Sequence, residues 1–190
     1  MNFGAFLALV LAAGLVGDSV GQAGTTPFIL RISENQTALH PTAGPNNMSN
    51  CLVVMPDGRL HLELRRQEFF DGKATLTTYE SALDSKDIGI LRSILDDPDV
   101  RALHPFAEPV VPRTFDEWHG FGADILRGAQ VQHVGYLTWP GREPNISAED
   151  KLAWKQAAAT LQHLVEWSHA VKSNKSNWRR VANPKDVCGQ

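Results

Sequence analysis

Apolar and polar residues alternate strictly between positions 59 and 65. The apolar positions are Leu60, Leu62 and Leu64, and the polar positions are Arg59, His61, Glu63 and Arg65. A period of two is typical of a strand with one face in the core and the other in water. We therefore expect the leucines to be buried and the four polar side chains to face solvent.

Two further strands are predicted beside this one. Residues 52–55 are apolar, and Pro56-Asp57-Gly58 predicts a tight hairpin turn between them and the alternating strand. Residues 74–79 are rich in threonine and end at a tyrosine, a composition that favours a third strand. These segments together predict an antiparallel meander.

The periodicity then changes to that of a helix. Asp84 followed by Asp87 is an N-cap pattern, and the apolar spacing predicts a helix to residue 95. Asp97-Pro98 predicts a short helical turn up to residue 103. A second hairpin is expected at 118–126 and 130–139, and Ser147 with Asp150 begins the longest predicted helix, which runs to residue 172.

The order of these elements is βββαββα. It predicts an α+β fold with an antiparallel sheet of about five strands and two helices packed on one face. We divide the chain into a signal peptide at 1–23, a flexible tether at 24–50, one α+β domain at 51–172 and a basic C-terminal tail at 173–190. The tether assignment depends on the turn and breaker residues in that segment.

The N-terminal segment has the pattern of a secretory leader. Residues 3–16 form an uninterrupted apolar and glycine run, shorter than the ~20 residues that a membrane-spanning helix needs. A small-residue segment ending at Ala23 follows it, as at a cleavage site. No Lys or Arg lies near Met1, where leaders usually carry positive charge. We expect a periplasmic or secreted protein without a stable membrane span after cleavage.

Cysteine content and charge bear on the compartment and on partners. In an oxidising compartment Cys51 and Cys188 are expected to form a disulfide, and the alternative is two unpaired thiols. The formal net charge is −3, which gives no electrostatic reason to expect a nucleic-acid partner. The tail is the one basic cluster, and either a solvated terminus or contact with an anionic surface would suit it.

The motifs of common catalytic and metal sites are missing from the sequence. There is no G-x-S-x-G elbow, no C-x-x-C and no complete glycine-rich phosphate loop. His163, Glu166 and His169 are three residues apart, so their side chains diverge around a helix, and we expect no metal site there. No cofactor is predicted.

Two sets of side chains remain as candidate binding residues. The polar row Arg59, His61, Glu63 and Arg65 could meet a partner, or it could be the wet side of an ordinary sheet. Trp167 falls off the apolar stripe of the last helix and Trp178 lies in the polar tail, so both are expected to be exposed, as binding residues or, for Trp178, as cover for a sheet edge. His119 and His133 could lie opposite each other in the second hairpin.

Several segments resemble an uncharacterised group of exported bacterial proteins. They are residues 57–63, residues 78–80 and the helix segment that includes Leu91 and residues 94–96. That resemblance implies export and no known activity. In the order of its elements between about Gly58 and Trp167, the chain is more remotely similar to emfourin, a proteinaceous inhibitor of thermolysin-like metalloproteases, and no inhibitory residue carries over.

These observations favour an exported, non-catalytic binding or inhibitor-like module of unknown partner. One alternative is a small periplasmic hydrolase with His61 or His119 as base. The other is a structural envelope protein, for which the predicted tether is mild support.

Overall fold

The computed structural model describes residues 27–38, 47–67, 73–106, 117–139, 147–182 and 187–188. Within them one antiparallel sheet of seven strands has the order β6-β5-β1-β2-β3-β4-β7. The strands are β1 (Leu30–Ala38), β2 (Asn47–Val54), β3 (Arg59–Gln67), β4 (Thr75–Ala82), β5 (Glu117–Arg127), β6 (Gln130–Thr138) and β7 (Arg179–Arg180). The predicted leader lies outside the described residues.

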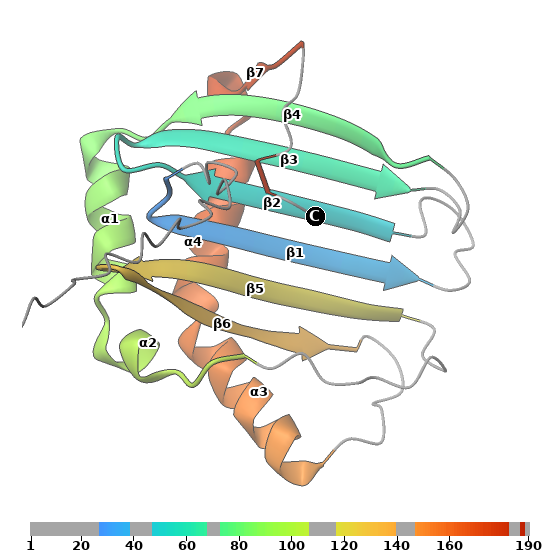
Figure 1. Ribbon diagram of the computed structural model, residues 1–190, viewed down its shortest axis with the longest axis vertical. Helices are drawn as coiled ribbons and strands as arrows, with labels where there is room; N and C mark the ends of the chain where they lie inside the picture. The colour runs from blue at the N-terminus through green and yellow to red at the C-terminus, as the bar shows by residue number, and fades with distance from the viewer. Residues whose placement is uncertain are drawn as a thin grey trace, which may run out of the picture.

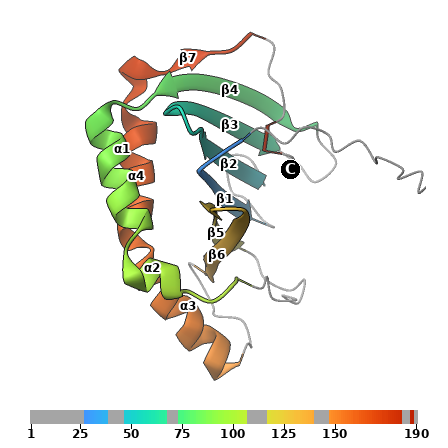
Figure 2. The ribbon, with the colours of Figure 1, turned by 60° about the vertical axis from the view of Figure 1, so that its left-hand side comes forward.

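Four α-helices accompany the sheet: α1 (Ser85–Leu95), α2 (Pro98–Ala102), α3 (Ala148–Thr160) and α4 (Gln162–Ser173). All lie on one side of it (Figures 1 and 2). The α+β class and the one-sided packing are as predicted, whereas the counts of five strands and two helices are wrong. None of the described helices has the length and apolar character needed to cross a membrane.

The additional strands explain the difference in the sheet. β1 lies at its centre between β5 and β2, in a segment predicted to be a flexible tether. β7 pairs with β4 through Arg180 and Arg179, within the predicted tail. Neither strand alternates along its whole length, because the large apolar residues of β1 are confined to Leu30 and Ile32 and β7 has just two residues.

Local sequence signals position the other elements as predicted. Gly58 adopts φ 83°, and its N–H donates to the Met55 carbonyl at 3.0 Å, which closes the β2–β3 turn. The Asp84 carboxylate accepts from the Asp87 N–H at 2.8 Å and caps α1. Ser147 caps α3 in the same way, by accepting from the Asp150 N–H at 3.0 Å.

The last predicted helix is interrupted at Leu161, whose fully buried side chain separates α3 from α4. α3 has no buried residue and reaches past β6, where Trp154 meets Trp139 with ring centroids 5.3 Å apart. α4 crosses the sheet and buries Leu164 and Trp167. The expected exposure of Trp167 is therefore wrong. The apolar stripe was defined for one continuous helix, whereas α3 and α4 are separate helices and a different set of α4 side chains meets the sheet.

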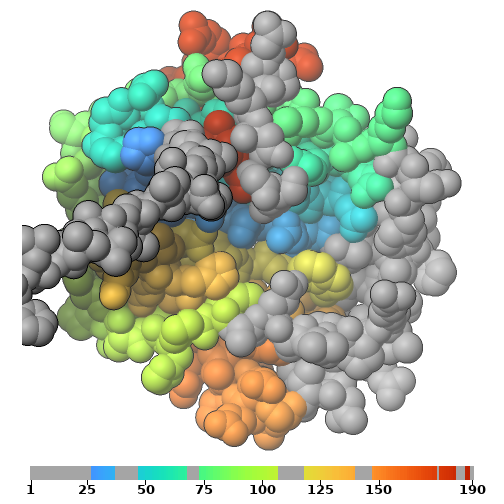
Figure 3. Space-filling view, viewed as in Figure 1, coloured from blue at the N-terminus to red at the C-terminus, as the bar shows by residue number. Residues whose placement is uncertain are grey.

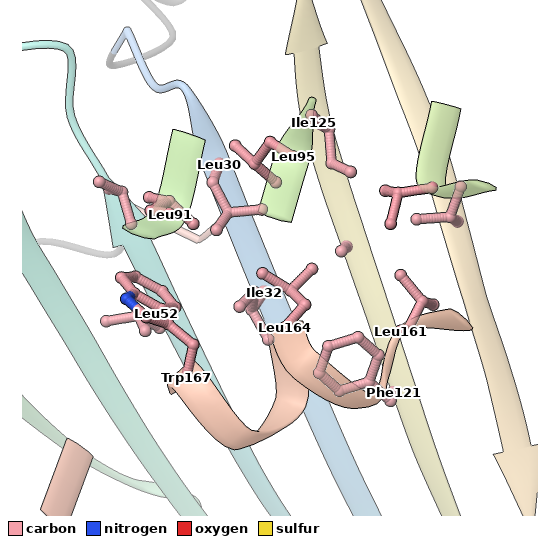
Figure 4. Close-up of a cluster of buried hydrophobic side chains, with 14 of the residues drawn as sticks. Leu30, Ile32, Leu52, Leu91, Leu95, Phe121, Ile125, Leu161, Leu164 and Trp167 are labelled. Atoms are coloured by element: carbon pink, nitrogen blue, oxygen red, sulfur yellow. The ribbon is translucent and has the colours of Figure 1, made fainter. Parts of the chain in front are cut away.

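The main core lies between the sheet and helices α1 and α4. Figure 4 shows Leu164 and Trp167 of α4, together with Leu161 just before this helix, facing side chains of β1, β2 and β5. Leu60 and Leu62 belong to this core, and Leu64 packs partly buried against it, as their alternation predicts. Burial of apolar surface here fixes which ends of the strands the helices cover.

Candidate functional site

The helix side of the sheet changes from apolar to polar along the strands. Three neighbouring rows of residues cross β3, β2, β1, β5 and β6 in register. The first row is buried beneath the helices: Leu62, Leu52, Ile32, Ala123 and Val134. The second is mostly half-buried: Leu64, Asn50, Glu34, Phe121 and Tyr136. The third is half-buried or exposed: Arg66, Met48, Gln36, His119 and Thr138.

The third row and all of the second row except Leu64 line an open cavity of about 500 Å³, which we call the helix-side groove. Val165 and His169 of α4 form its wall on the core side. The strands extend past the helices at this end, where the arrowheads of β1, β3 and β6 lie in Figure 1. The groove thus begins where helical cover of the sheet stops.

Glu34 is the acidic group at the boundary between core and groove. Lys172 of α4 donates from Nζ to its Oε2 at 2.6 Å, and His169 Nε2 lies 3.2 Å from its Oε1. Burial alone would raise the pKa of the Glu34 carboxyl. The hydrogen bond and charge of Lys172, with His169 and Asn50, outweigh burial and hold that pKa below its ordinary value of 4.5. Glu34 is therefore ionised at neutral pH and already neutralised by α4.

Two aromatic rings form part of the groove floor. Phe121 and Tyr136 stack with centroids 5.5 Å apart and an interplanar angle of 21°. Burial, and secondarily the charge of Glu34, raise the pKa of the Tyr136 hydroxyl above its usual 10.0. Tyr136 consequently stays a neutral hydrogen-bonding group beside an apolar ring.

Cationic and titratable side chains occupy the outer row of the groove. Arg66 is exposed and forms no ion pair with another described residue. His119 lies three strands away in the same row, a span of roughly 14 Å at the usual strand spacing. One small anion cannot bridge that distance, so the row suits an extended ligand.

The four side chains of the predicted polar row on β3 differ in their exposure to solvent. Its side chains point away from the helices, but His61 and Glu63 are 5 % and 3 % exposed. The expectation that both face solvent is wrong, because the disulfide between Cys51 and Cys188 holds residues 187–188 over them. Figures 1 and 3 show this short red segment on the face of the sheet that lies away from the helices. Arg59 remains exposed and pairs with Asp57 at 2.6 Å, while Arg65 is half-buried.

The Glu63 carboxylate is the centre of this covered site. Its Oε1 accepts from the backbone N–H of Val187 at 2.6 Å and of Cys188 at 3.3 Å, and it lies 2.9 Å from His61 Nε2. Val53 and the two cysteines form a small apolar cluster beside it, against which Val187 packs. The predicted disulfide is confirmed, and the last described residues are part of the fold.

The other histidines do not converge. His119 lies opposite Thr138, and His133 lies opposite Asp124, so the possible pairing of the two histidines is wrong. His133 Nδ1 contacts Asp124, which also accepts from Arg31 Nε at 2.9 Å. Across the described part of the chain, no three His, Cys, Asp or Glu side chains are grouped as metal ligands.

The two histidines considered as hydrolytic bases have different surroundings. His61 is buried against Glu63 beneath the C-terminal residues, and His119 lines the groove. Glu34, Phe121 and Tyr136 were not selected from the sequence. One sequence feature could have indicated them. In the second half of β1 the alternation of apolar and polar residues stops, and the polar residues Glu34 and Gln36 occupy positions that face the helix side.

Comparison of the chain with protein-family models finds no match, and comparison with curated protein sequences finds no relative at a significant level.

Proposed function

We propose that the protein is an exported, non-catalytic binding or inhibitor-like module, and that its partner docks in the helix-side groove. The observation that carries this proposal is the change from a buried apolar row to an uncovered polar row on one continuous sheet face. A rigid sheet holds these side chains in fixed positions, as a binding site requires. The cavity of about 500 Å³ falls in the size range of ligand sites.

The charges of the groove favour an acidic segment of a partner protein. Lys172 neutralises Glu34, which leaves the exposed Arg66 as the uncompensated charge among the described lining residues. The span between Arg66 and His119 fits an extended chain, and Phe121 with Tyr136 offers apolar contact beneath it.

Export is part of this proposal. The buried disulfide supports an oxidising compartment, because cytosolic thiols are generally kept reduced. The apolar run at residues 3–16 would supply the leader.

A charge reversal in the groove tests the proposed function. Protein secreted or recovered from the periplasm serves as bait, and captured partners are identified by mass spectrometry. Arg66→Glu places a negative charge where an acidic partner would dock, so binding of that partner should weaken at least tenfold, as measured by calorimetry. Because Arg66 is exposed, stability should change by less than ~0.5 kcal/mol.

Arg180→Glu is the matched control. Arg180 is also exposed but lies on β7, at the sheet edge far from β1 and β5. The control should bind the same partner as the wild type does. Equal loss of binding in both variants would indicate a non-specific charge effect, and unchanged binding by Arg66→Glu would remove the groove from the proposal.

A further inference from the structure

The site around Glu63 combines features that a structural carboxylate does not require. It is a buried acid whose hydrogen bonds come from His61 on its own strand and from two residues that follow β7 in the chain and are attached to β2 by the disulfide. Val187 and Cys188 are 124 and 125 residues away in sequence from Glu63. The cover is therefore separable from the sheet that it covers.

We propose that residues 187–188 form a redox-controlled latch over the His61–Glu63 pair. With the disulfide formed, the latch is closed and the pair is buried. When a dithiol reductant opens the disulfide, the segment leaves and the carboxylate and imidazole face solvent on an otherwise intact sheet. This inference concerns the outer face and does not depend on the proposed function of the groove.

The closed latch protects its own bond. Cys51 is 2 % and Cys188 is 6 % exposed, so a reductant reaches their sulfur atoms only after the segment lifts. Lifting it breaks both backbone hydrogen bonds to Glu63, and hydrogen bonds to a charged group are the stronger kind. The carboxylate thus controls how often the disulfide becomes accessible.

The chemical step is thiol–disulfide exchange. A thiolate of the reductant attacks one sulfur of the Cys51–Cys188 bond, forms a mixed disulfide and releases the other cysteine as a thiolate. The second thiol of the reductant then displaces the remaining cysteine. In total, two electrons and two protons pass from the dithiol, which becomes a disulfide, to the protein, whose disulfide becomes two thiols.

The sheet has the contacts needed to survive the opening. β2 and β3 pair with each other over eight residues, and each also pairs with a further strand. The main core on the opposite side contains none of the latch residues. Release of the segment leaves these interactions in place.

Histidine footprinting of the full chain tests the latch. Oxidised protein and protein reduced with dithiothreitol are treated briefly with diethyl pyrocarbonate, and modification is quantified by mass spectrometry. His61 should react at least tenfold faster after reduction. His163, whose side chain is 81 % exposed, is the internal control and should react equally in both samples. Unchanged protection of His61 in the reduced protein would overturn the proposal.

The rate of reduction provides the second measurement. Glu63→Gln keeps the shape of the side chain and removes its charge, so dithiothreitol should open the disulfide about tenfold faster than in the wild type. Glu166→Gln, an exposed change on α4, should leave the rate unaltered. An unaltered rate in Glu63→Gln would show that the carboxylate does not hold the latch.

Amide hydrogen exchange separates local opening from unfolding. In the reduced chain, core strands β1 and β5 should keep their protection. If the amides of Ile32 on β1 and Ile125 on β5 lose their protection under the conditions in which the His61 side chain becomes reactive, reduction unfolds the domain and the latch proposal is wrong.

Discussion

Glu34 and Glu63 are two carboxylates on opposite faces of the same sheet, and they are stabilised in different ways. Glu34, on β1, receives a cationic side chain from α4 and remains open to the helix-side groove. Glu63, on β3, receives backbone N–H groups and is 3 % exposed. The first carboxylate is stabilised by the positive charge of Lys172, and the second by hydrogen bonds from a covering segment.

The difference shows how one sheet can support two kinds of polar site. The helix that neutralises Glu34 also covers the core, so the groove can remain open without loss of packing. Glu63 lies on the face that the described helices leave uncovered (Figure 2), and its burial depends on the segment that the disulfide attaches. Variants that disrupt the contacts of Glu63 and of Glu34 separately should show which of the two sites contributes more to the free energy of unfolding.

Removal of the disulfide should have the largest effect. Cys188→Ser opens a loop with a sequence separation of 137 residues and should lower the free energy of unfolding by about 4–5 kcal/mol in the loop-entropy model. Equilibrium urea unfolding of the mature chain measures the change. Cys51→Ser and the double variant should show the same loss, because either substitution removes the same bond. A loss below ~1 kcal/mol would mean that the disulfide and the segment it attaches contribute little to the stability of the fold.

Loss of charge at Glu63 should have an intermediate effect. Glu63→Gln weakens two backbone hydrogen bonds and the contact with His61, so we expect a loss of about 1–3 kcal/mol in unfolding free energy at pH 7. Glu80→Gln is the matched control. Its carboxylate lies on the neighbouring strand but is about half exposed, and the loss there should stay below ~0.5 kcal/mol.

Equal losses in the two variants would show that the C-terminal cover does not distinguish Glu63 from an ordinary surface acid. Strand alternation predicted the direction of Glu63 correctly but not its burial. The residues that cover it come from the far end of the chain, and no local pattern records that contact. The paired cysteines were the only sequence feature that indicated it.

The helix-side core was predictable because one physical rule determines it. Leu60 and Leu62 alternate with polar residues, and burial of one strand face requires that pattern. The turn at Gly58 and the cap at Asp84 were predictable for a similar reason, since each satisfies a local backbone requirement. Their causes lie within a few residues of the feature itself.

The groove was not predictable because its strands lose alternation where helical cover ends. Glu34 and Gln36 of β1 face the helix side, as Leu30 and Ile32 do, but they are polar. The sequence therefore predicts a tether in this segment and not a strand. The polar half of β2 from Asn47 to Asn50 obscured the start of that strand in the same way. The missed strand segments carry Glu34 and Gln36 of β1 and Met48 and Asn50 of β2, whereas the groove residues of β5 and β6 lie in strands that the sequence does predict.

The smallest expected effect concerns the pH dependence of Glu34. Because its pKa in the folded protein is lowered from 4.5, the ionised carboxylate stabilises the fold at neutral pH, and this contribution is lost as the pH falls through the folded-state pKa. Glu34→Gln should therefore cost about 1 kcal/mol at pH 7, and the difference from the wild type should shrink toward zero at pH 3. Urea unfolding at both pH values measures it, with Glu166→Gln as an exposed control that should differ from the wild type by less than ~0.5 kcal/mol at each. A difference that stays constant from pH 7 to pH 3 would show that Lys172 does not hold Glu34 in its charged form, and the contrast with Glu63 would then lie in exposure alone.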